Sequence, residues 1–237
     1  MEGNRGATDD IVSVSGQDCF IPFKSPISLL VTGASFSGKS YLVADLIRNR
    51  AKMFNPEPVE ILYAYGMWTP LYEELETTIP NIKFINRIPS KEEVDDFTAD
   101  NKPRLLILDD LMTQLGDCPD VTEYFTVYVH HKALSCILLL QNLFYQGAKC
   151  LRDISLNVQG MFLFKNIRNP QQIGILATQM FPGSVRRKFF LDAYQKACAR
   201  QFGYLYVDIN PRNPEKYQLR TDILPHQITK IFLPTSG

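Results

Sequence analysis

The sequence lacks several features that mark common functional classes. Its 237 residues carry 25 Lys and Arg against 25 Asp and Glu, so no net charge draws the chain to nucleic acid or to a membrane surface. Contacts to DNA through a few local basic side chains stay open. No apolar run approaches the length needed to span a bilayer, and residues 1–10 are polar and acidic, unlike a secretory signal. We therefore expect an intracellular protein without a membrane partner.

Cysteine and histidine are also scarce. The five cysteines are scattered, odd in number and without metal-ligand spacing, which argues against a disulfide framework and favours a reducing compartment. Two of the three histidines, His130 and His131, are adjacent. Adjacent helical positions do not converge on one ion as residues i and i+4 would. We expect no metal centre built from histidine or cysteine.

From Ile27 onward the chain alternates short apolar runs with amphipathic stretches, which is typical of a mostly parallel sheet flanked by helices. We predict an α/β domain over residues 19–209, a flexible arm over 1–18 and an irregular tail over 210–237. The predicted strands are Ile27–Thr32, Glu60–Tyr65, Ile82–Asn86, Leu105–Asp109, Cys136–Gln141, Met161–Lys165 and Tyr204–Asp208. The predicted helices are Lys39–Arg50, Thr69–Glu76, Lys91–Phe97, Val121–Lys132, Ala148–Leu156, Gln171–Met180 and Ser184–Ala199. Ser90 and Glu93 form a capping box at the start of the third helix.

One segment between the first predicted strand and helix matches the phosphate-loop pattern G-x-x-x-x-G-K-[ST]. Glycines let the backbone turn so that successive N–H groups point at phosphate oxygens, and the following helix directs its positive end at the same anion. Lysine reaches the β- and γ-phosphates and the final hydroxyl binds Mg²⁺. We therefore predict a site for a nucleoside triphosphate such as ATP. Its binding residues are Gly33, Ala34, Ser35, Phe36, Ser37, Gly38, Lys39 and Ser40.

A second motif, four apolar residues followed by Asp109 and Asp110, indicates a buried strand with two carboxylates at its C-terminal end. Ligands collect at that end of the strands in open α/β sheets. We predict that Asp109 holds Mg²⁺ together with Ser40, and that Asp110 polarises the attacking water as general base. A simple strand-to-turn transition is the alternative interpretation of the same residues.

The next predicted strand ends at Gln141. In phosphate-loop ATPases whose second carboxylate activates water, this strand lies between the phosphate-loop strand and the Asp-bearing strand. Gln141 would then point at the γ-phosphate and the attacking water, because an amide can donate to one and accept from the other. A strand-end amide that caps the following turn is the competing interpretation.

Hydrolysis also needs positive charge near the transferred phosphoryl group, and many ATPases take an arginine from a neighbouring subunit. Arg152 is our candidate, with Arg168 as the other option; a solvated or ion-paired surface arginine is the plain alternative for each. The aromatic residues Tyr63, Tyr65, Trp68 and Tyr72 follow the second strand. They could flank an adenine, although packing in the core or an interface is the commoner role of such residues.

These motifs together resemble the DNA-packaging ATPases of the FtsK–HerA superfamily, in the branch found in poxvirus-like, adomavirus-like and Polinton-type elements. The resemblance runs from about Pro26 to Pro225. It rests on the two motifs above and on Trp68–Tyr72, Gln141–Gly147, Arg152–Asn157, Phe164–Asn166 and Arg220–Pro225. Two positions depart from the pattern: Phe36 is bulky for a phosphate loop, and Asp110 stands where many relatives have the longer Glu.

The resemblance implies a RecA-like ASCE phosphate-loop ATPase that assembles into a ring, a pentamer or hexamer, with each ATP site completed between subunits. It implies double-stranded DNA and a capsid vertex or capsid protein as partners, and a virion-associated protein in the cytoplasm or nucleus of the host. Two other functions stay open. One is a capsid-assembly scaffold that binds ATP without turnover; the other is a small-molecule kinase.

Overall fold

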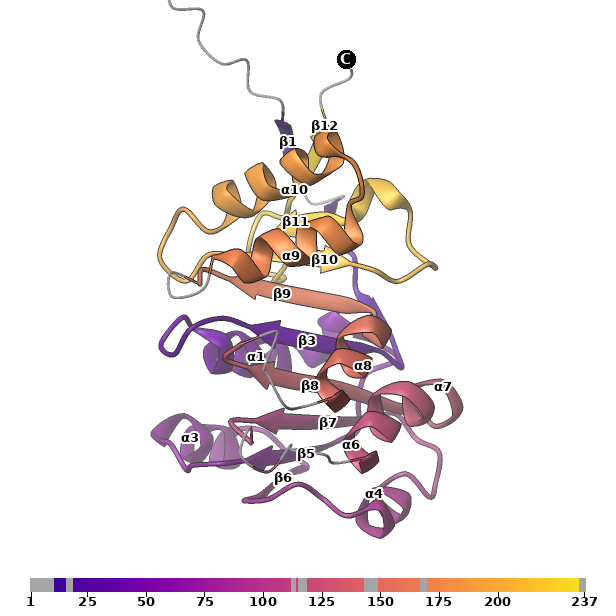
Figure 1. Ribbon diagram of the computed structural model, residues 1–237. Coiled ribbons are helices and arrows are strands. Elements are labelled where there is room, and N and C mark those ends of the chain that lie inside the picture. The colour runs from indigo at the N-terminus through magenta and orange to yellow at the C-terminus, as the bar shows by residue number, and fades with distance from the viewer. Residues whose placement is uncertain are drawn as a thin grey trace, which may run out of the picture.

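A ten-stranded sheet runs the length of the molecule in the computed structural model (Figure 1), which describes residues 11–15, 19–111, 114, 119–142, 149–166 and 170–234. Its order is β1-β12-β11-β10-β9-β3-β8-β7-β5-β6. The six strands from β9 to β6 all run parallel to one another. They are β9 (Gly160–Phe164), β3 (Ser28–Thr32), β8 (Leu134–Leu140), β7 (Arg104–Asp109), β5 (Glu60–Tyr65) and β6 (Ile82–Ile85).

The central strands are buried along their whole length. Every residue of β3, β7 and β8 is buried, which explains why these strands are near-continuous apolar runs in the sequence rather than alternating patterns. β8 pairs with β3 on one side and with β7 on the other. The predicted position of this strand, between the phosphate-loop strand and the Asp-bearing strand, is confirmed.

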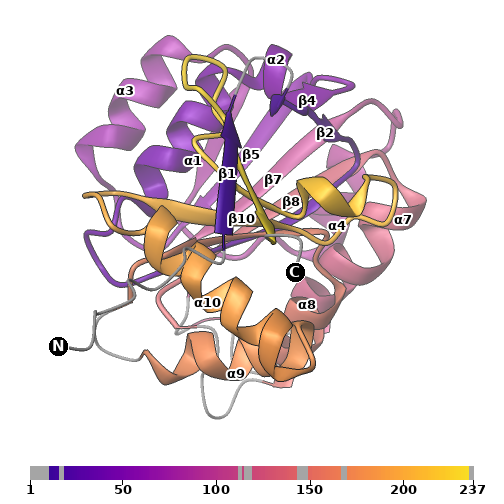
Figure 2. The ribbon, with the colours of Figure 1, turned by 90° about the horizontal axis from the view of Figure 1, so that it is seen from above.

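Helices cover both faces of the sheet, as Figure 2 shows from above. One face carries α1 (Lys39–Arg48), α2 (Arg50–Met53) and α3 (Pro70–Thr78). The other carries α4 (Lys91–Phe97), α6 (Pro119–Glu123), a π-helical turn (Tyr124–Tyr128), α7 (Val129–His131), α8 (Lys149–Asn157), α9 (Gln171–Met180) and α10 (Ser184–Ala197). The α/β fold with a mostly parallel sheet is therefore confirmed, as is the capping box of Ser90 and Glu93. None of the helices in the described residues is long and apolar enough to cross a membrane.

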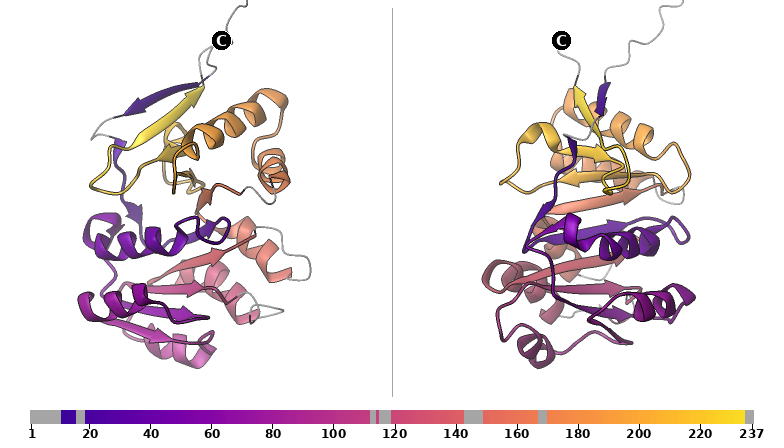
Figure 3. Two further views of the ribbon diagram at one scale, coloured as in Figure 1. Left: turned by 90° about the vertical axis from the view of Figure 1, so that its left-hand side faces the viewer. Right: turned by 180° about the vertical axis from the view of Figure 1, so that it is seen from behind.

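Four strands extend the sheet beyond β9 in antiparallel pairs: β10 (Tyr204–Asp208), β11 (Leu219–Thr221), β12 (Lys230–Pro234) and β1 (Ile11–Ser15). Figure 3 shows the indigo β1 lying along the yellow β12 at one end of the molecule. The predicted irregular tail is wrong where β11, a 3₁₀ turn (Glu215–Tyr217) and β12 form. The predicted arm is wrong for residues 11–15.

The reason for these errors is physical. The strands β11 and β12 have three and five residues and lie among prolines and asparagines that suggest loops. One strand of the pair also buries a charge, because Arg220 is 1% exposed and donates to Asp208 over 2.6 Å. Hydrophobic periodicity cannot reveal such a strand. A further parallel pair, β2 (Phe23–Lys24) with β4 (Phe54–Asn55), forms a separate small sheet.

Candidate nucleotide-hydrolysis site

The phosphate-loop segment 33–40 connects β3 to α1, so its backbone turns at the C-terminal edge of the parallel strands. Gly33 lies so close to β9 that an added Cβ would be 2.5 Å from the Cβ of Phe164, and Gly38 has a φ of +101°. Both positions therefore need glycine. Lys39 folds back over the loop and donates from Nζ to the carbonyl oxygens of Gly33 and Ala34 over 2.8 and 2.9 Å.

The bulky Phe36 is accommodated because its side chain leaves the loop. It has a φ of +62°, and the side chain is 99% exposed. A left-handed backbone is costly for an aromatic residue, so this position is a strained point in the loop. The departure from the usual small residue thus leaves the concave side of the loop clear.

Asp109 ends β7 beside the phosphate loop and is buried, with an exposure of 4%. Its Oδ2 atom accepts three hydroxyl hydrogen bonds: from Ser40 over 2.9 Å, from Tyr63 over 2.9 Å and from Tyr72 over 2.8 Å. A buried carboxylate requires such partners, because an unpaired charge away from water is very unfavourable. The hydrogen bond to Ser40 places the two residues predicted to bind Mg²⁺ in direct contact.

Asp110 follows at the surface, with its backbone in the left-handed region at a φ of +56°. Its carbonyl oxygen packs tightly on Gly66, where an added Cβ would be only 2.1 Å away. The backbone N–H of Gly66 donates to the carbonyl of Asp109 over 3.0 Å. Gln141, just past the end of β8, donates from Nε2 to Oδ1 of Asp110 over 3.3 Å. A residue that follows the neighbouring strand β8 therefore donates a hydrogen bond to the carboxylate of Asp110.

The two motifs meet at one place. The pKa of Lys39 is lowered from its usual value, because the effect of burial is larger than the opposing attraction of the nearby Asp109 and Asp110 carboxylates. The ammonium therefore sits within the field of both acids, seventy positions further along the chain. The structure brings Lys39, Ser40, Asp109, Asp110 and Gln141 together; the role of each residue stays a prediction.

The residues present fit a magnesium ion bound with a nucleotide. The hydroxyl of Ser40 and the carboxylate of Asp109 are hard oxygen ligands, and they already lie 2.9 Å apart. Within the described part of the chain no group of three or more His, Cys, Asp or Glu could hold a metal alone. Mg²⁺ commonly binds through one or two protein oxygens, with phosphate oxygens and waters completing its shell. Ser40 and Asp109 suit that arrangement.

Of the two predicted arginines, only Arg152 can be placed, and it does not contact this cluster within the described part of the chain. Arg152 lies on α8 with its side chain exposed. No hydrogen bond or ion pair joins it to the phosphate loop among the described residues. Arg168 lies outside the described residues. An exposed arginine is compatible with a role in a neighbouring subunit, and equally with a solvated surface.

The aromatic residues on β5 and after it pack together rather than form an open slot. Tyr63 and Tyr72 are buried, with their ring centroids 5.0 Å apart, and Trp68 and Phe84 pack against Tyr72. The adenine-flanking interpretation fails for Tyr63 and Tyr72, and the packing interpretation holds. Sequence reasoning missed that the hydroxyls of Tyr63 and Tyr72 donate hydrogen bonds to Asp109. The parallel pairing of β5 with β7, which sets Tyr65 beside Asp109, is the signal that could have indicated these hydrogen bonds.

No protein-family model and no curated protein matches the sequence. Among solved structures, the genome packaging NTPase B204 of Sulfolobus turreted icosahedral virus 2, in complex with ATP-gammaS, is similar with a TM-score of 0.54 and 13% identity. The match covers 89% of this chain and 98% of B204. At this identity the likeness shows a shared α/β fold.

Two further structures are more distant. The ATPase DotB of Legionella pneumophila has a TM-score of 0.36 and 17% identity over 58% of this chain and 40% of its own. EccC (ATPases 2 and 3) of Thermomonospora curvata, in complex with a signal sequence peptide, has a TM-score of 0.42 and 10% identity over 90% of this chain and 37% of its own. Neither is similar enough to carry an argument about this chain.

Proposed function

We propose that this protein is an ATP-hydrolysing motor that packages double-stranded viral or transposon DNA into a capsid. The observation that carries the hydrolytic part is the convergence of Lys39, Ser40 and Asp109 at the mouth of one phosphate loop, with Asp110 and Gln141 beside them. This is the set of groups that a phosphate-loop hydrolase needs for binding and for activating water.

In the proposed mechanism, backbone N–H groups of the loop and the ammonium of Lys39 hold the triphosphate. Bound Mg²⁺, held by Ser40 and Asp109, would neutralise charge on the β- and γ-phosphates. Asp110 accepts a proton from the attacking water, and its exposed carboxylate is accessible to that water. Gln141 contacts Asp110 and so fixes the direction in which that carboxylate faces.

The assembly part of the proposal places Arg152 in the site of an adjacent subunit of a homo-oligomeric ring. Its exposure on α8 supports this arrangement. The motor part is supported by the sequence resemblance to FtsK–HerA packaging ATPases and by the shared fold with a viral genome packaging NTPase. Double-stranded DNA, a capsid vertex or capsid protein, and a virion-associated location in the host belong to the same proposal.

The test is phosphate release from Mg–ATP, measured across protein concentration with and without double-stranded DNA. A packaging motor releases phosphate faster with DNA, and its rate per subunit rises with concentration as rings form. Transfer of phosphate to a small acceptor would instead make the protein a kinase. Tight ATP binding without turnover in either condition would make it a scaffold.

The trans role of Arg152 has its own test. Two inactive variants, Lys39→Ala and Arg152→Ala, regain activity when mixed, because a Lys39→Ala subunit can lend its arginine to an intact phosphate loop next to it. A mixture of Lys39→Ala with Asp110→Asn is the control and stays inactive, since both residues act within the same subunit's phosphate and water site. Failure of the first mixture to recover would remove Arg152 from the mechanism.

A further inference from the structure

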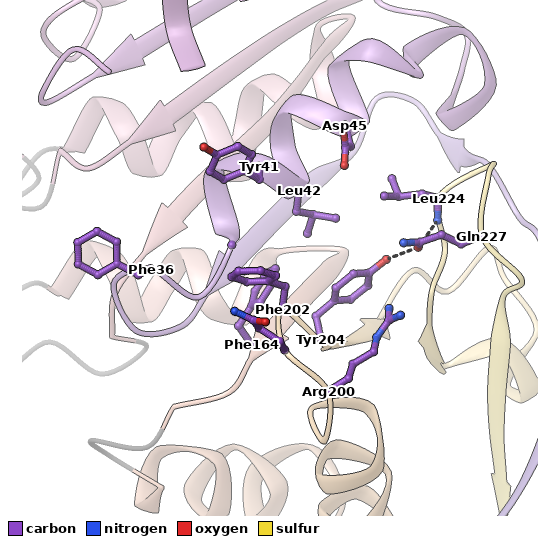
Figure 4. Close-up of a pocket in the computed structure, with 12 residues that line it drawn as sticks. Phe36, Tyr41, Leu42, Asp45, Phe164, Arg200, Phe202, Tyr204, Leu224 and Gln227 are labelled. Carbon is purple, nitrogen blue, oxygen red and sulfur yellow. Dashed lines mark hydrogen bonds between the residues drawn. The ribbon is translucent and has the colours of Figure 1, made fainter. Parts of the chain in front are cut away.

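A cavity of about 620 Å³ opens beside the phosphate loop and α1, toward β9 and β10 (Figure 4). Asp109 ends β7, which lies on the other side of β3 in the sheet. The walls of the cavity come from four places: the phosphate loop and first turns of α1, Phe164 at the end of β9, the segment from Arg200 to Tyr204 at the start of β10, and the residues Leu224 and Gln227 that follow β11. The size is within the range of sites that hold small molecules. The cavity is continuous with the phosphate loop, because Phe36 and Gly38 belong to both.

The apolar wall is built around Phe202, which lies against the start of α1. A Cβ added to Gly38 would be 3.1 Å from the ring atom Cδ1 of Phe202, so the ring rests on the backbone of the last loop glycine. Phe202 is nevertheless 58% exposed, and Tyr41 on α1 is 67% exposed. Leu42, Phe164 and Leu224 add to the apolar lining. Exposed aromatic rings beside a loop that binds phosphate can stack against a nucleobase.

Asp45, Arg200 and Gln227 are polar residues in the wall of the cavity, and hydrogen bonds orient the amide of Gln227. Its Oε1 accepts from the hydroxyl of Tyr204 over 3.5 Å and from the backbone N–H of Leu224 over 3.4 Å. Tyr204 is itself held, because its hydroxyl accepts from the backbone N–H of Ile223 over 3.1 Å. With the amide oxygen engaged, the amide nitrogen points away from this network toward the interior of the cavity (Figure 4). It offers donors to a ring nitrogen or carbonyl.

From this arrangement we infer that the cavity binds the nucleobase of the nucleoside triphosphate, with Phe202 as its stacking face and Gln227 as a donor to its polar edge. The inference rests on the proposed nucleotide function, because the phosphates anchored at Lys39 bring the base to this side of α1. It places the base site beside β9 and β10, on the other side of β3 in the sheet from the aromatic cluster at β5. It also gives a function to the C-terminal extension of the sheet, which supplies both residues.

The test compares two ligands on the full chain by titration calorimetry: a hydrolysis-resistant ATP analogue and inorganic tripolyphosphate, each with Mg²⁺. Phe202→Ala should weaken binding of the analogue roughly tenfold, the order expected when a base loses one aromatic face, and leave tripolyphosphate unchanged. Phe202→Tyr, which keeps the ring, should restore analogue affinity. Val185→Ala removes another exposed apolar side chain, on α10 outside the cavity, and should change neither affinity.

The outcomes separate the two proposals. Unchanged affinity of Phe202→Ala for the analogue would overturn the base site while leaving the phosphate site intact. Equal weakening of both ligands would also overturn it, because Phe202 would then support the loop rather than contact a base. If wild type bound neither ligand, the nucleotide function itself would fail. Gln227→Ala should weaken the analogue selectively in the same way, to a smaller degree.

Discussion

The hydrogen bonds from the hydroxyls of Tyr63 and Tyr72 to Asp109 lead to a prediction that the sequence motifs alone do not give. Both side chains are buried, and both donate to Oδ2 of Asp109, over 2.9 and 2.8 Å. Tyr72→Phe removes one of these donors and keeps the ring in its packing against Tyr63 and Phe84. The change therefore isolates the hydrogen bond from the packing.

The size of the effect follows from the geometry. A hydrogen bond to a charged group stabilises a folded protein by about 1.5–3 kcal/mol. Asp109 keeps two other donors in Tyr72→Phe and no buried donor is left without a partner, so we expect a loss at the lower end, about 1.5 kcal/mol. Residues that orient a metal ligand typically change metal affinity roughly 10–100-fold when altered. We therefore expect half-saturation by Mg²⁺ to need about tenfold more of the ion.

Two measurements check this prediction: the urea midpoint of unfolding, and the Mg²⁺ dependence of nucleotide binding by calorimetry. Tyr65→Phe is the matched control, because Tyr65 belongs to the same cluster but makes no hydrogen bond to Asp109 among the described residues. If Tyr72→Phe and Tyr65→Phe behaved alike in both measurements, the claim that the tyrosines position Asp109 would be refuted.

Four further outcomes are expected. Lys39→Ala should abolish nucleotide binding by calorimetry, because the loop loses its ammonium; undiminished turnover would contradict the site. Asp110→Asn should retain binding but lose phosphate release at least a hundredfold, on the order of a lost general base, whereas loss of binding would mean that the two acids exchange roles. Gly66→Ala should destabilise the fold by about 1–3 kcal/mol in urea, since its Cβ would lie 2.1 Å from a carbonyl oxygen of Asp110. Burial and the Asp109 carboxylate raise the pKa of both Tyr63 and Tyr72 above 10. The stability that their neutral hydroxyls contribute to the fold is therefore fully present below pH 10 and is lost as the pH rises through the raised pKa values. The double Phe variant should show a flatter alkaline decline.

The parts of the fold that follow local rules could be predicted from sequence. Glu60–Tyr65 and Tyr204–Asp208 form strands with the predicted ends, and Lys91–Phe97 forms a helix that begins at its capping box. Each has a strong local signal: an apolar β-branched and aromatic run, or a serine followed three residues later by glutamate. The phosphate loop could be predicted in the same way, because the residues that define its motif are consecutive in the sequence.

The rest depends on contacts between distant segments. β12 forms because β11 and β1 lie beside it; its apolar run, Ile231–Leu233, is only three residues long and ends at a proline, so it is too short to predict a strand by itself. The contact of Tyr72 with Asp109 requires that α3 pack over β7, and the cavity at Phe202 requires that the turn before β10 return to α1. Neither contact follows from spacing along the chain. The two motifs of the site could therefore be predicted from the sequence, but the tyrosines that hold Asp109 and the cavity at Phe202 could not.

The most direct test of the account is phosphate release from Mg–ATP by wild type and by Asp110→Asn, together with the affinity of both for a hydrolysis-resistant analogue. The account predicts turnover by wild type that double-stranded DNA accelerates, no turnover by the variant, and equal binding by the two. Equal phosphate release from both proteins would show that the acids at the end of β7 do not catalyse hydrolysis, and would contradict the central claim.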